Sequence, residues 1–204
     1  MNEIQKEVLI GCSLGDISYD VNYSTKKARF QICHSVKSEE YVRHKYDIFK
    51  NYCNSEPKYR YSKYNNIYFN TTMYTEFYEF AQMFFNGNIR GVPQNIEELL
   101  TPRSLAYWFC DDGTSCYVAA KRVVNVKSFV RLCTDRYNEE DVLKLIKALQ
   151  NKFEISSKIF SPPSRRGLKE IYIGLNDSQK FFDIIEPFIF PSFKYKIKRP
   201  YIKT

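Results

Sequence analysis

The sequence predicts an α+β protein built from two similar halves. Helix and strand patterns follow the order helix, strand, strand, helix, strand, strand, helix, and this order starts again near residue 101. Each half also opens with an apolar helical segment that ends in acid, LIGCSLGDI at 9–17 and LAYWFCDDG at 105–113. The strands alternate polar and apolar side chains, which is typical of antiparallel sheets with one face against a core.

The first half is predicted to hold three helices and four strands. In chain order these are a helix at 2–15, strands at 17–25 and 27–35, a helix at 37–54, a hairpin within 57–72 and a helix at 74–88. Asn2 can cap the first helix, with Gln5 as its capping-box partner. Ser38 is the expected cap of the second helix. The hairpin is expected to turn at Asn65-Asn66, and Gly87 to end the third helix.

The second half repeats this order. Its expected elements are a helix running through 103–113, strands within 115–120 and 127–134, a helix at 138–153, a hairpin around 162–168 and a last helix at 177–190. Thr101 caps the first of these helices, with Pro102 at its first position, and Asn138 caps the next, with Asp141 at its third. Pro187 should interrupt the last.

The boundary between the halves is expected in GVPQNIEELLTP at 91–102, which carries two prolines. We therefore expect an N-terminal repeat at 1–92 and a C-terminal repeat at 93–204.

Composition narrows the class of partner. The net charge is +8, the pI is about 9.1, and hydrophobic residues make up 44%, which argues against global disorder. Such a basic excess most often indicates nucleic-acid binding, with an acidic membrane surface or simple solubility as alternatives. Six cysteines without a C-x-x-C pair and only two histidines argue against zinc. No apolar run approaches the roughly 18 residues that span a bilayer.

Small residues suggest that the two acid-ending helices pack side by side. Gly11 and Gly15 lie four residues apart on one face, and so do Ala106 and Cys110. Small residues at this spacing let two helix backbones approach closely. We therefore expect the two helices to meet at the interface between the halves, with their carboxyl ends adjacent.

This packing would bring Asp16 and Asp112 together. Two adjacent carboxylates repel, so one must hold a proton unless a cation lies between them, and helix C-termini favour that cation further. Oxygen ligands suit Mg²⁺, and metal ions between carboxylates are used for phosphodiester hydrolysis. Taken singly, the Gly-Asp or Asp-Asp-Gly sequence at the end of either helix is equally well explained as an ordinary turn, since Asp and Gly are common turn residues. Their matching positions in the two halves favour a site.

Both segments resemble the nine-residue motif of the LAGLIDADG homing endonucleases, in the form that carries two motifs in one chain. LTPRSLAYWFCDDG at 100–113 is similar to the second-motif region LTP.SLAYWF.DDG of the yeast mitochondrial omega-intron subgroup. The first motif departs at its ninth position, where Ile17 replaces glycine. The resemblance covers almost the whole chain. It implies that the two sheets form a saddle along the DNA major groove, with a pseudo-two-fold axis through the paired helices.

The resemblance also assigns the acids of the site. The metal-binding acid of the family is the eighth motif residue, which falls on Asp16 and on Asp112. Gly15 and Asp111 are the neighbouring residues expected in the same metal site, with Asp111 in a supporting rather than a catalytic role.

Two basic residues near the metal centre are implied in the same way. One falls on Arg90, just before the GVP segment, and the other on Lys196 in FKYKIK, with Lys194 and Lys198 as alternatives. The subgroup has lysine where Arg90 stands. Because arginine keeps its proton, we expect charge stabilisation from Arg90 rather than positioning of water. Ordinary phosphate contact is the alternative for both residues.

Strand residues that face away from the core are candidates for DNA contact. If Phe30 and Ile32 face inward, their neighbours face outward. With basic residues of the turns, the candidate set is Lys26, Arg29, Gln31, Lys58, Arg60, Lys63, Lys127, Arg131, Lys158, Arg165, Arg166 and Lys169. Each taken singly is as readily a solvated surface charge. His34 and His44 are expected to be surface or hydrogen-bonded residues rather than ligands, and Trp108 to be core.

These features together predict a monomeric, Mg²⁺-dependent endonuclease that cuts both strands of a long, asymmetric double-stranded DNA site and leaves short 3′ overhangs. Two or three ions are expected, with Mn²⁺ able to substitute and Ca²⁺ able to bind without supporting cleavage. An intron RNA maturase or a non-cleaving DNA-binding protein on the same fold is the alternative. No membrane partner is expected. An organelle such as the mitochondrion is the favoured location, with a bacterial or phage cytoplasm as the alternative.

Overall fold

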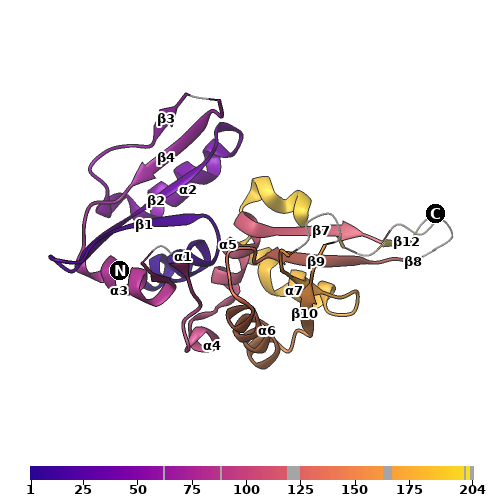
Figure 1. Ribbon diagram of the computed structural model, residues 1–204. Coiled ribbons are helices and arrows are strands. Elements are labelled where there is room, and N and C mark those ends of the chain that lie inside the picture. The colour runs from indigo at the N-terminus through magenta and orange to yellow at the C-terminus, as the bar shows by residue number, and fades with distance from the viewer. Residues whose placement is uncertain (62, 88, 119–124, 163–166, 200, 203–204) are drawn as a thin grey trace.

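The computed structural model describes residues 1–61, 63–87, 89–118, 125–162, 167–199 and 201–202. The predicted element order is present in both halves, which confirms the fold class (Figure 1). The first half consists of α1 (Glu3–Leu14), β1 (Ile17–Asn22), β2 (Lys27–Ser35), α2 (Glu39–Phe49), β3 (Lys58–Arg60), β4 (Asn66–Asn70) and α3 (Thr75–Phe84).

The second half begins at the helix that follows Thr101. It consists of α5 (Pro102–Asp112), β7 (Gly113–Tyr117), β8 (Asn125–Val126), β9 (Ser128–Cys133), α6 (Glu139–Phe153), β10 (Ser157–Phe160), β11 (Glu170–Ile173) and α7 (Ser178–Ile185). Short elements that the sequence did not predict are β8, β5 (Phe85–Asn86), β6 (Ile89–Arg90), α4 (Ile96–Leu99), β12 (Tyr201–Ile202) and 3₁₀ turns at Val36–Ser38, Lys50–Tyr52, Glu186–Phe188 and Pro191–Lys196.

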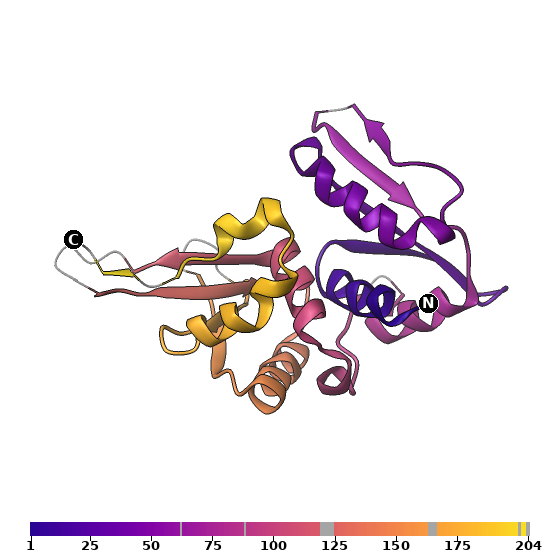
Figure 2. The same ribbon diagram turned by 180° about the vertical axis from the view of Figure 1, so that it is seen from behind.

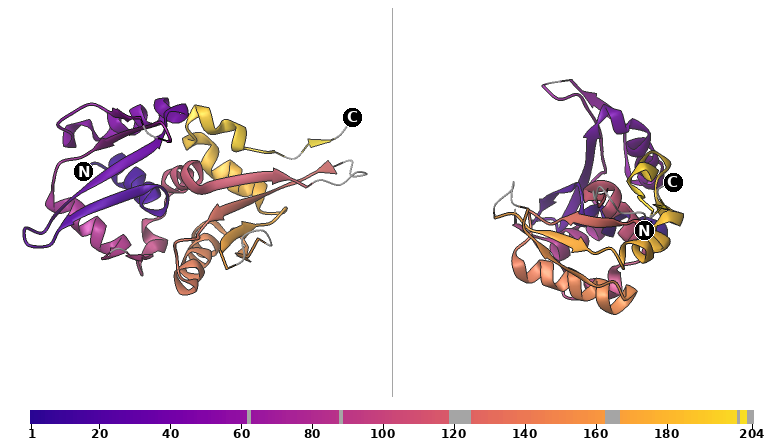
Figure 3. Two further views of the ribbon diagram at one scale, coloured as in Figure 1. Left: turned by 45° about the horizontal axis from the view of Figure 1, so that its top comes forward. Right: turned by 90° about the vertical axis from the view of Figure 1, so that its right-hand side faces the viewer.

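Four strands of each half form an antiparallel sheet, and β8 instead pairs with β12. The strand orders are β1-β2-β4-β3 and β7-β9-β11-β10, so the two sheets have the same topology. The two lobes lie on either side of α1 and α5, which meet in the middle of the molecule (Figures 1 and 2). The β1–β2 hairpin and the β7–β9 pair extend from this centre in opposite directions (Figure 3).

The alternation of side chains gives each sheet one buried face. Phe30 and Ile32 of β2 are almost fully buried, as predicted, and Phe30 packs edge-on against Phe49 of α2 and Phe77 of α3, with ring centroids 5.0 and 4.9 Å apart. Trp108 is fully buried, which confirms its place in the core. Within the described ranges, no helix is long and apolar enough to cross a membrane.

The contact between α1 and α5 depends on two glycines. A Cβ on Gly11 would lie 2.4 Å from the carbonyl oxygen of Ser104 and 2.8 Å from Cβ of Tyr107, and one on Gly15 would lie 2.6 Å from Cβ of Asp111. We expected Ala106 and Cys110 at this contact. The atoms nearest to the two glycines belong instead to residues 104, 107 and 111. The large side chain of Tyr107 fits at this contact because its ring turns away from Gly11 and stacks beside His44.

Three of the predicted caps form as expected. Asn2 and Gln5 make a capping box on α1, and Asn138 accepts a hydrogen bond from the backbone of Asp141 on α6. Thr101 caps α5 in a capping box with Ser104, with Pro102 at the first position.

Three predicted boundaries are wrong. Ser38 makes no capping hydrogen bond, because a 3₁₀ turn precedes α2 and Ser35 accepts from the backbone of Lys37 instead. The first-half hairpin does not turn at Asn65-Asn66, since β4 begins at residue 66 and the connection spans 61–65. Gly87 does not end α3: Phe85 is already extended, and its ring packs on Tyr19 with centroids 5.4 Å apart.

Candidate metal centre at the ends of the motif helices

The helices α1 and α5, called here the motif helices, end side by side and carry three aspartates at their carboxyl ends. Asp16 follows α1 directly, and Asp111 and Asp112 are the last residues of α5. The backbone N–H of Gly15 donates to the carbonyls of Gly11 and Cys12, which ends α1 just before Asp16. Two chain segments 95 residues apart thus place their carboxylates in one region.

Asp111 is already neutralised by a lysine of the other half. Its buried Oδ1 accepts from Nζ of Lys45 at 2.8 Å and from the hydroxyl of Tyr41 at 3.0 Å, and both charged side chains are fully buried. Burial acts to raise the pKa of Asp111, but nearby positive charge, chiefly that of Lys45, and the hydrogen bonds from Lys45 and Tyr41 together outweigh it, and the pKa falls below its usual range. The other oxygen of Asp111 lies 3.5 Å from the backbone nitrogen of Asp16, which donates to it. Asp111 therefore holds α2 and the end of α1 in place.

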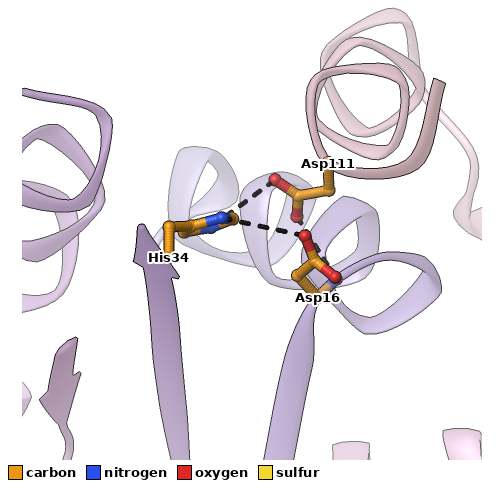
Figure 4. A group of neighbouring side chains, drawn as sticks. All are labelled: Asp16, His34 and Asp111. Atoms are coloured by element: carbon orange, nitrogen blue, oxygen red, sulfur yellow. Dashed lines mark hydrogen bonds and ion pairs between the residues drawn. The ribbon is translucent and has the colours of Figure 1, made fainter. Parts of the chain in front are cut away.

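His34 completes a compact group with two of the acids (Figure 4). Its Nδ1 lies 3.7 Å from Oδ2 of Asp16 and its Nε2 lies 3.9 Å from Oδ1 of Asp111. One potential ligand atom from each of the three residues lies within 4.8 Å of the others. The ammonium of Lys45, however, lies 3.2 Å from Nε2 of His34 and is already bonded to Asp111. A cation of the protein itself therefore occupies this group, and His34 is hydrogen-bonded, as the sequence suggested.

Burial and the Lys45 charge lower the pKa of His34 to about 4, so its imidazole is neutral at pH 7 and can accept from Lys45. Burial acts to lower the pKa of Lys45, but nearby negative charge, chiefly that of Asp111, and the hydrogen bond to Asp111 together outweigh it, and the pKa is raised. The Lys45–Asp111 pair is thus ionised, and His34 adds no charge to the centre.

Among the residues that the structure describes, Asp16 and Asp112 have no lysine or arginine within ion-pair distance. Burial and the negative charges of Asp16 and Asp111 raise the pKa of Asp112 to about 7, against the opposing charges of Arg136 and Arg90. Burial and Asp111 also raise the pKa of Asp16. Asp112 makes no hydrogen bond or ion pair with any other residue that the structure describes. Two half-buried carboxylates with raised pKa values, in a region that already holds the charge of Asp111, are a donor set that suits a divalent cation, because the cation removes the repulsion between negative charges.

Arg90 and Lys196 take matching positions on the two motif helices. The buried guanidinium of Arg90 donates to the carbonyls of Ser13 at 2.9 Å and Gly15 at 2.7 Å, and also to that of Ile17. Nζ of Lys196 donates to the carbonyls of Phe109 and Cys110, at 3.2 and 2.7 Å. Each residue therefore satisfies carbonyls at the end of one helix and adds positive charge behind its aspartate.

The alternative lysines lie elsewhere. Nζ of Lys198 lies over the ring of Tyr117, 5.4 Å from its centroid, and Lys194 is exposed. Burial lowers the pKa of Lys196, with the opposing charges of Cys110 and Asp111 limiting the change.

Sequence reasoning missed three residues of this centre: Lys45, Tyr41 and Arg136. For Lys45 a signal was present, since it shares one face of α2 with Tyr41, Val42 and Phe49, all buried. A lysine within an apolar stripe indicates a buried anion, because lysine is almost never fully buried without a partner. Arg136 offered no such signal, because the turn that carries it has no periodic pattern.

The predicted DNA-contact residues lie mainly on the exposed faces and edges of the two sheets. Lys26, Lys58, Arg60, Lys63, Lys127 and Lys158 are exposed, and Lys26 has a positive φ of 50° in the β1–β2 turn. Arg165 and Arg166 lie outside the described residues. Contact with DNA by any member of the set stays a prediction.

Other members of the set already have protein partners. Arg29 pairs with Asp20 at 2.9 Å, Arg131 with Glu170 at 3.2 Å, and Lys169 with Glu139 at 2.9 Å. Gln31 donates to Oδ1 of Asn70 at 2.7 Å. The exposed pairs of Arg29 and Lys169 are weak and leave these side chains available for exchange, whereas Arg131 pairs with the buried Glu170.

Comparison with known proteins identifies the family. The sequence pattern described as the LAGLIDADG DNA endonuclease family matches residues 6–181. The chain belongs to this family. It is 24% identical to the DNA endonuclease I-ChuI of Chlamydomonas applanata over 97% of this chain and 95% of the relative. It is 29% identical to a probable intron-encoded endonuclease of Wickerhamomyces canadensis, over 97% and 85%.

A solved structure of the family shares the overall arrangement. The homing endonuclease I-WcaI, bound to its DNA recognition sequence, superposes with a TM-score of 0.85 and 27% identity, over 97% of this chain and 87% of that one. A relative of a different kind is the cytochrome b mRNA maturase bI2 of Debaryomyces hansenii, 27% identical over 94% of this chain and 72% of the relative.

Proposed function

We propose that this protein is a site-specific homing endonuclease that hydrolyses both strands of a long, asymmetric DNA duplex with divalent metal and leaves short 3′ overhangs. Membership of the DNA endonuclease family supports the nuclease class. The observation that carries the proposal is the pair Asp16 and Asp112, which come from the ends of two packed helices and both have raised pKa values. Carboxylates arranged in this way repel one another in the absence of a cation, and they can bind a divalent metal ion when one is present.

In this proposal Asp16 and Asp112 hold Mg²⁺, with Gly15 and Asp111 beside them. The bound ion would supply the charge that activates a water and stabilises the leaving oxygen. Asp111 orients the backbone of Asp16 and stays ionised through Lys45. Arg90 and Lys196 fix the helix ends and offset negative charge that develops in the transition state.

The basic strand faces would hold the duplex over this centre. I-WcaI, which has a similar fold, was solved bound to its DNA recognition sequence. By the same arrangement, the exposed residues of the two sheets would contact the major groove on either side of the motif helices, as one chain with internal pseudo-two-fold symmetry. Because the halves differ in sequence, the site they read is expected to be asymmetric.

Cleavage of the natural target tests the proposal. A plasmid carrying the joined flanks of the reading frame should be linearised by the protein with Mg²⁺. Asp112→Asn should lower the rate by about 10³-fold or more, because the lost carboxylate removes several kcal/mol of charge stabilisation. Binding of the same DNA in Ca²⁺ should persist in the variant, showing that the fold is intact.

A matched control is Asp47→Asn, which changes an exposed acid of α2 outside the centre. It should cleave as the unchanged protein does. Full activity of Asp112→Asn would remove the metal-site assignment, and absence of cleavage by the unchanged protein would remove the endonuclease assignment itself.

A second candidate function is that of an intron RNA maturase. The similarity to a protein named as an mRNA maturase, over 94% of this chain, favours it. The two functions can be separated by measuring affinity for the intron RNA and for the intronless DNA at one salt concentration. Tight RNA binding together with accelerated splicing, but without DNA cleavage, would support the maturase.

A further inference from the structure

Arg136 lies in a turn that the structure holds rigidly against the first motif helix. The turn 134–137 joins β9 to α6. Oγ1 of Thr134 donates to the carbonyl of Lys169 at 2.7 Å, and the backbone N–H of Tyr137 donates to the carbonyl of Thr134 at 3.0 Å. The buried Tyr137 also donates from its hydroxyl to the carbonyl of Leu14, at 3.0 Å, near the end of α1. A residue of the second half is thereby anchored beside Asp16 of the first.

The side chain of Arg136 lines a hollow that also contains the predicted metal ligand. This hollow has a volume of about 520 Å³, and its walls include Asp16, Ser18, Arg90 and Arg136. The positive charge of Arg136 acts on both Asp16 and Asp112, opposing the burial and like charges that raise their pKa values. The guanidinium of Arg136 therefore shares one hollow with Asp16, and its charge also acts on Asp112.

Within the described residues the donors of Arg136 have no partner, unlike those of the two basic residues that the sequence predicted. Arg90 and Lys196 donate to helix carbonyls. Arg136 is exposed, and it makes no hydrogen bond or ion pair with another residue in the described part of the chain. A guanidinium with free N–H groups binds phosphate in a bidentate fashion, and it keeps its charge at every relevant pH.

Only the second half carries this residue. Counted back from the cap positions Asn138 and Ser38, Arg136 corresponds to Val36, and Thr134 corresponds to His34. The first half therefore presents an apolar side chain and a neutral imidazole where the second half presents a cation.

We propose that Arg136 binds the phosphate at which one strand of the DNA is cut, and that the other strand lacks an equivalent contact. This proposal rests on the endonuclease function proposed above. It assigns a further substrate-binding residue to that reaction, and it predicts that the two strands depend on the protein to different extents. When the contact is removed, the two strands should be cut one after the other, because the strand whose phosphate Arg136 binds would be cleaved more slowly.

The test compares Arg136→Ala, Arg136→Lys and a control, Arg43→Ala, which removes a guanidinium that pairs with Glu39 on α2. A supercoiled plasmid with the joined flanks, labelled separately on each strand, gives both strand-cleavage rates. We expect Arg136→Ala to slow one strand by about 10²-fold and to accumulate nicked circles. Arg136→Lys should recover part of that rate, and Arg43→Ala should leave both rates unchanged.

Binding without metal provides a readout that does not depend on catalysis. In EDTA, the slope of log affinity against log salt should fall by about one for Arg136→Ala and stay the same for Arg136→Lys. Unchanged strand rates and an unchanged slope in Arg136→Ala would overturn the proposal while leaving the endonuclease intact. Equal slowing of both strands would overturn the assignment to one strand. Failure of the unchanged protein to cleave would instead refute the proposed function, and the strand assignment with it.

Discussion

Helices α2 and α6 hold the same place in the two halves, but one carries a buried lysine where the other carries a leucine. Counted from Ser38 and Asn138, Lys45 corresponds to Leu145, and both are fully buried. Leu145 packs in an ordinary apolar core. Lys45 instead reaches across to Asp111 of the second half. The comparison shows that the two halves share a backbone fold but not their buried charges. The lysine in the first half neutralises an aspartate of the second half.

The same division of work is seen at the ends of the motif helices. Arg90 and Lys196 cap α1 and α5 in matching ways, and Asp16 and Asp112 follow at matching motif positions. Around this symmetric pair, the first half adds Lys45 and the second half adds an extra acid, Asp111. Changes to the symmetric pair should therefore act equally, and changes to the added residues should act unequally.

The largest expected effect is on the symmetric acids. Asp16→Asn and Asp112→Asn should each lower cleavage of both strands by about 10³-fold or more, since each removes a carboxylate from a shared metal site. Initial rates on a target plasmid give the measurement. If one variant kept substantial activity while the other lost it, the two motif acids would not be equivalent.

The next largest effect is expected for Lys45 and Asp111, which have no charged counterparts in the other half. Lys45→Leu copies the residue of the second half, and it should cost about 3–5 kcal/mol in the free energy of unfolding because Asp111 stays buried without a counter-ion. Adding Asp111→Leu should recover most of that loss, since an apolar pair replaces the ion pair. Urea unfolding provides the measurement.

The matched control for this pair is Leu145→Met, a volume-conserving change that should cost less than about 1.5 kcal/mol. A loss for Lys45→Leu no larger than that of the control would mean that Asp111 does not depend on Lys45. A double variant as unstable as the single one would point to packing rather than charge.

Arg90 and Lys196 donate to carbonyls at the ends of the motif helices, and the stability lost when each is replaced should scale with the number of carbonyls it serves. Arg90→Met should destabilise the protein by about 2–3 kcal/mol and Lys196→Met by about 1–2 kcal/mol, because Arg90 serves three buried carbonyls and Lys196 two. Arg199→Met removes only surface ion pairs to Asp183 and Glu186, and it should change stability by less than about 1 kcal/mol. Equal losses in all three variants would show that the helix carbonyls find other donors.

The smallest effect is that of pH on the metal-free protein. The pKa of Asp112 is raised to about 7, so the folded state favours the protonated acid, and the stability it contributes is lost as pH rises from about 4 through 7. At pH 8 the metal-free Asp112→Asn variant should be more stable than the unchanged protein by about 1–2 kcal/mol, because the asparagine is never charged.

At pH 4 this difference should be small, and Mg²⁺ should reduce it at pH 8 by binding to the unchanged protein. Thermal unfolding at both pH values, with and without Mg²⁺, gives the measurement. A variant that is less stable than the unchanged protein at pH 8 without metal would contradict the raised pKa.

Local patterns in the sequence determined much of this molecule. Capping residues at Asn2, Thr101 and Asn138 placed the starts of three helices, because a cap acts within one turn of the chain. Period-two alternation placed the strands and their buried faces, and the two motifs pointed to Gly11, Gly15 and the aspartates. Short 3₁₀ turns and the five-residue hairpin connection were missed, since packing rather than local preference sets them.

The motif alignment assigned different roles to Asp111 and Asp112, but only the tertiary structure gave the physical reason for the difference. Asp111 and Asp112 are adjacent and chemically identical in sequence, yet one accepts hydrogen bonds from Lys45 and Tyr41 and the other has no such donor among the described residues and lies within the field of Asp16. Their pKa values move in opposite directions because burial, charge and hydrogen bonds depend on neighbours that are distant along the chain. Arg136 became part of the site for the same reason, since the anchor on Leu14 that places it spans 123 residues.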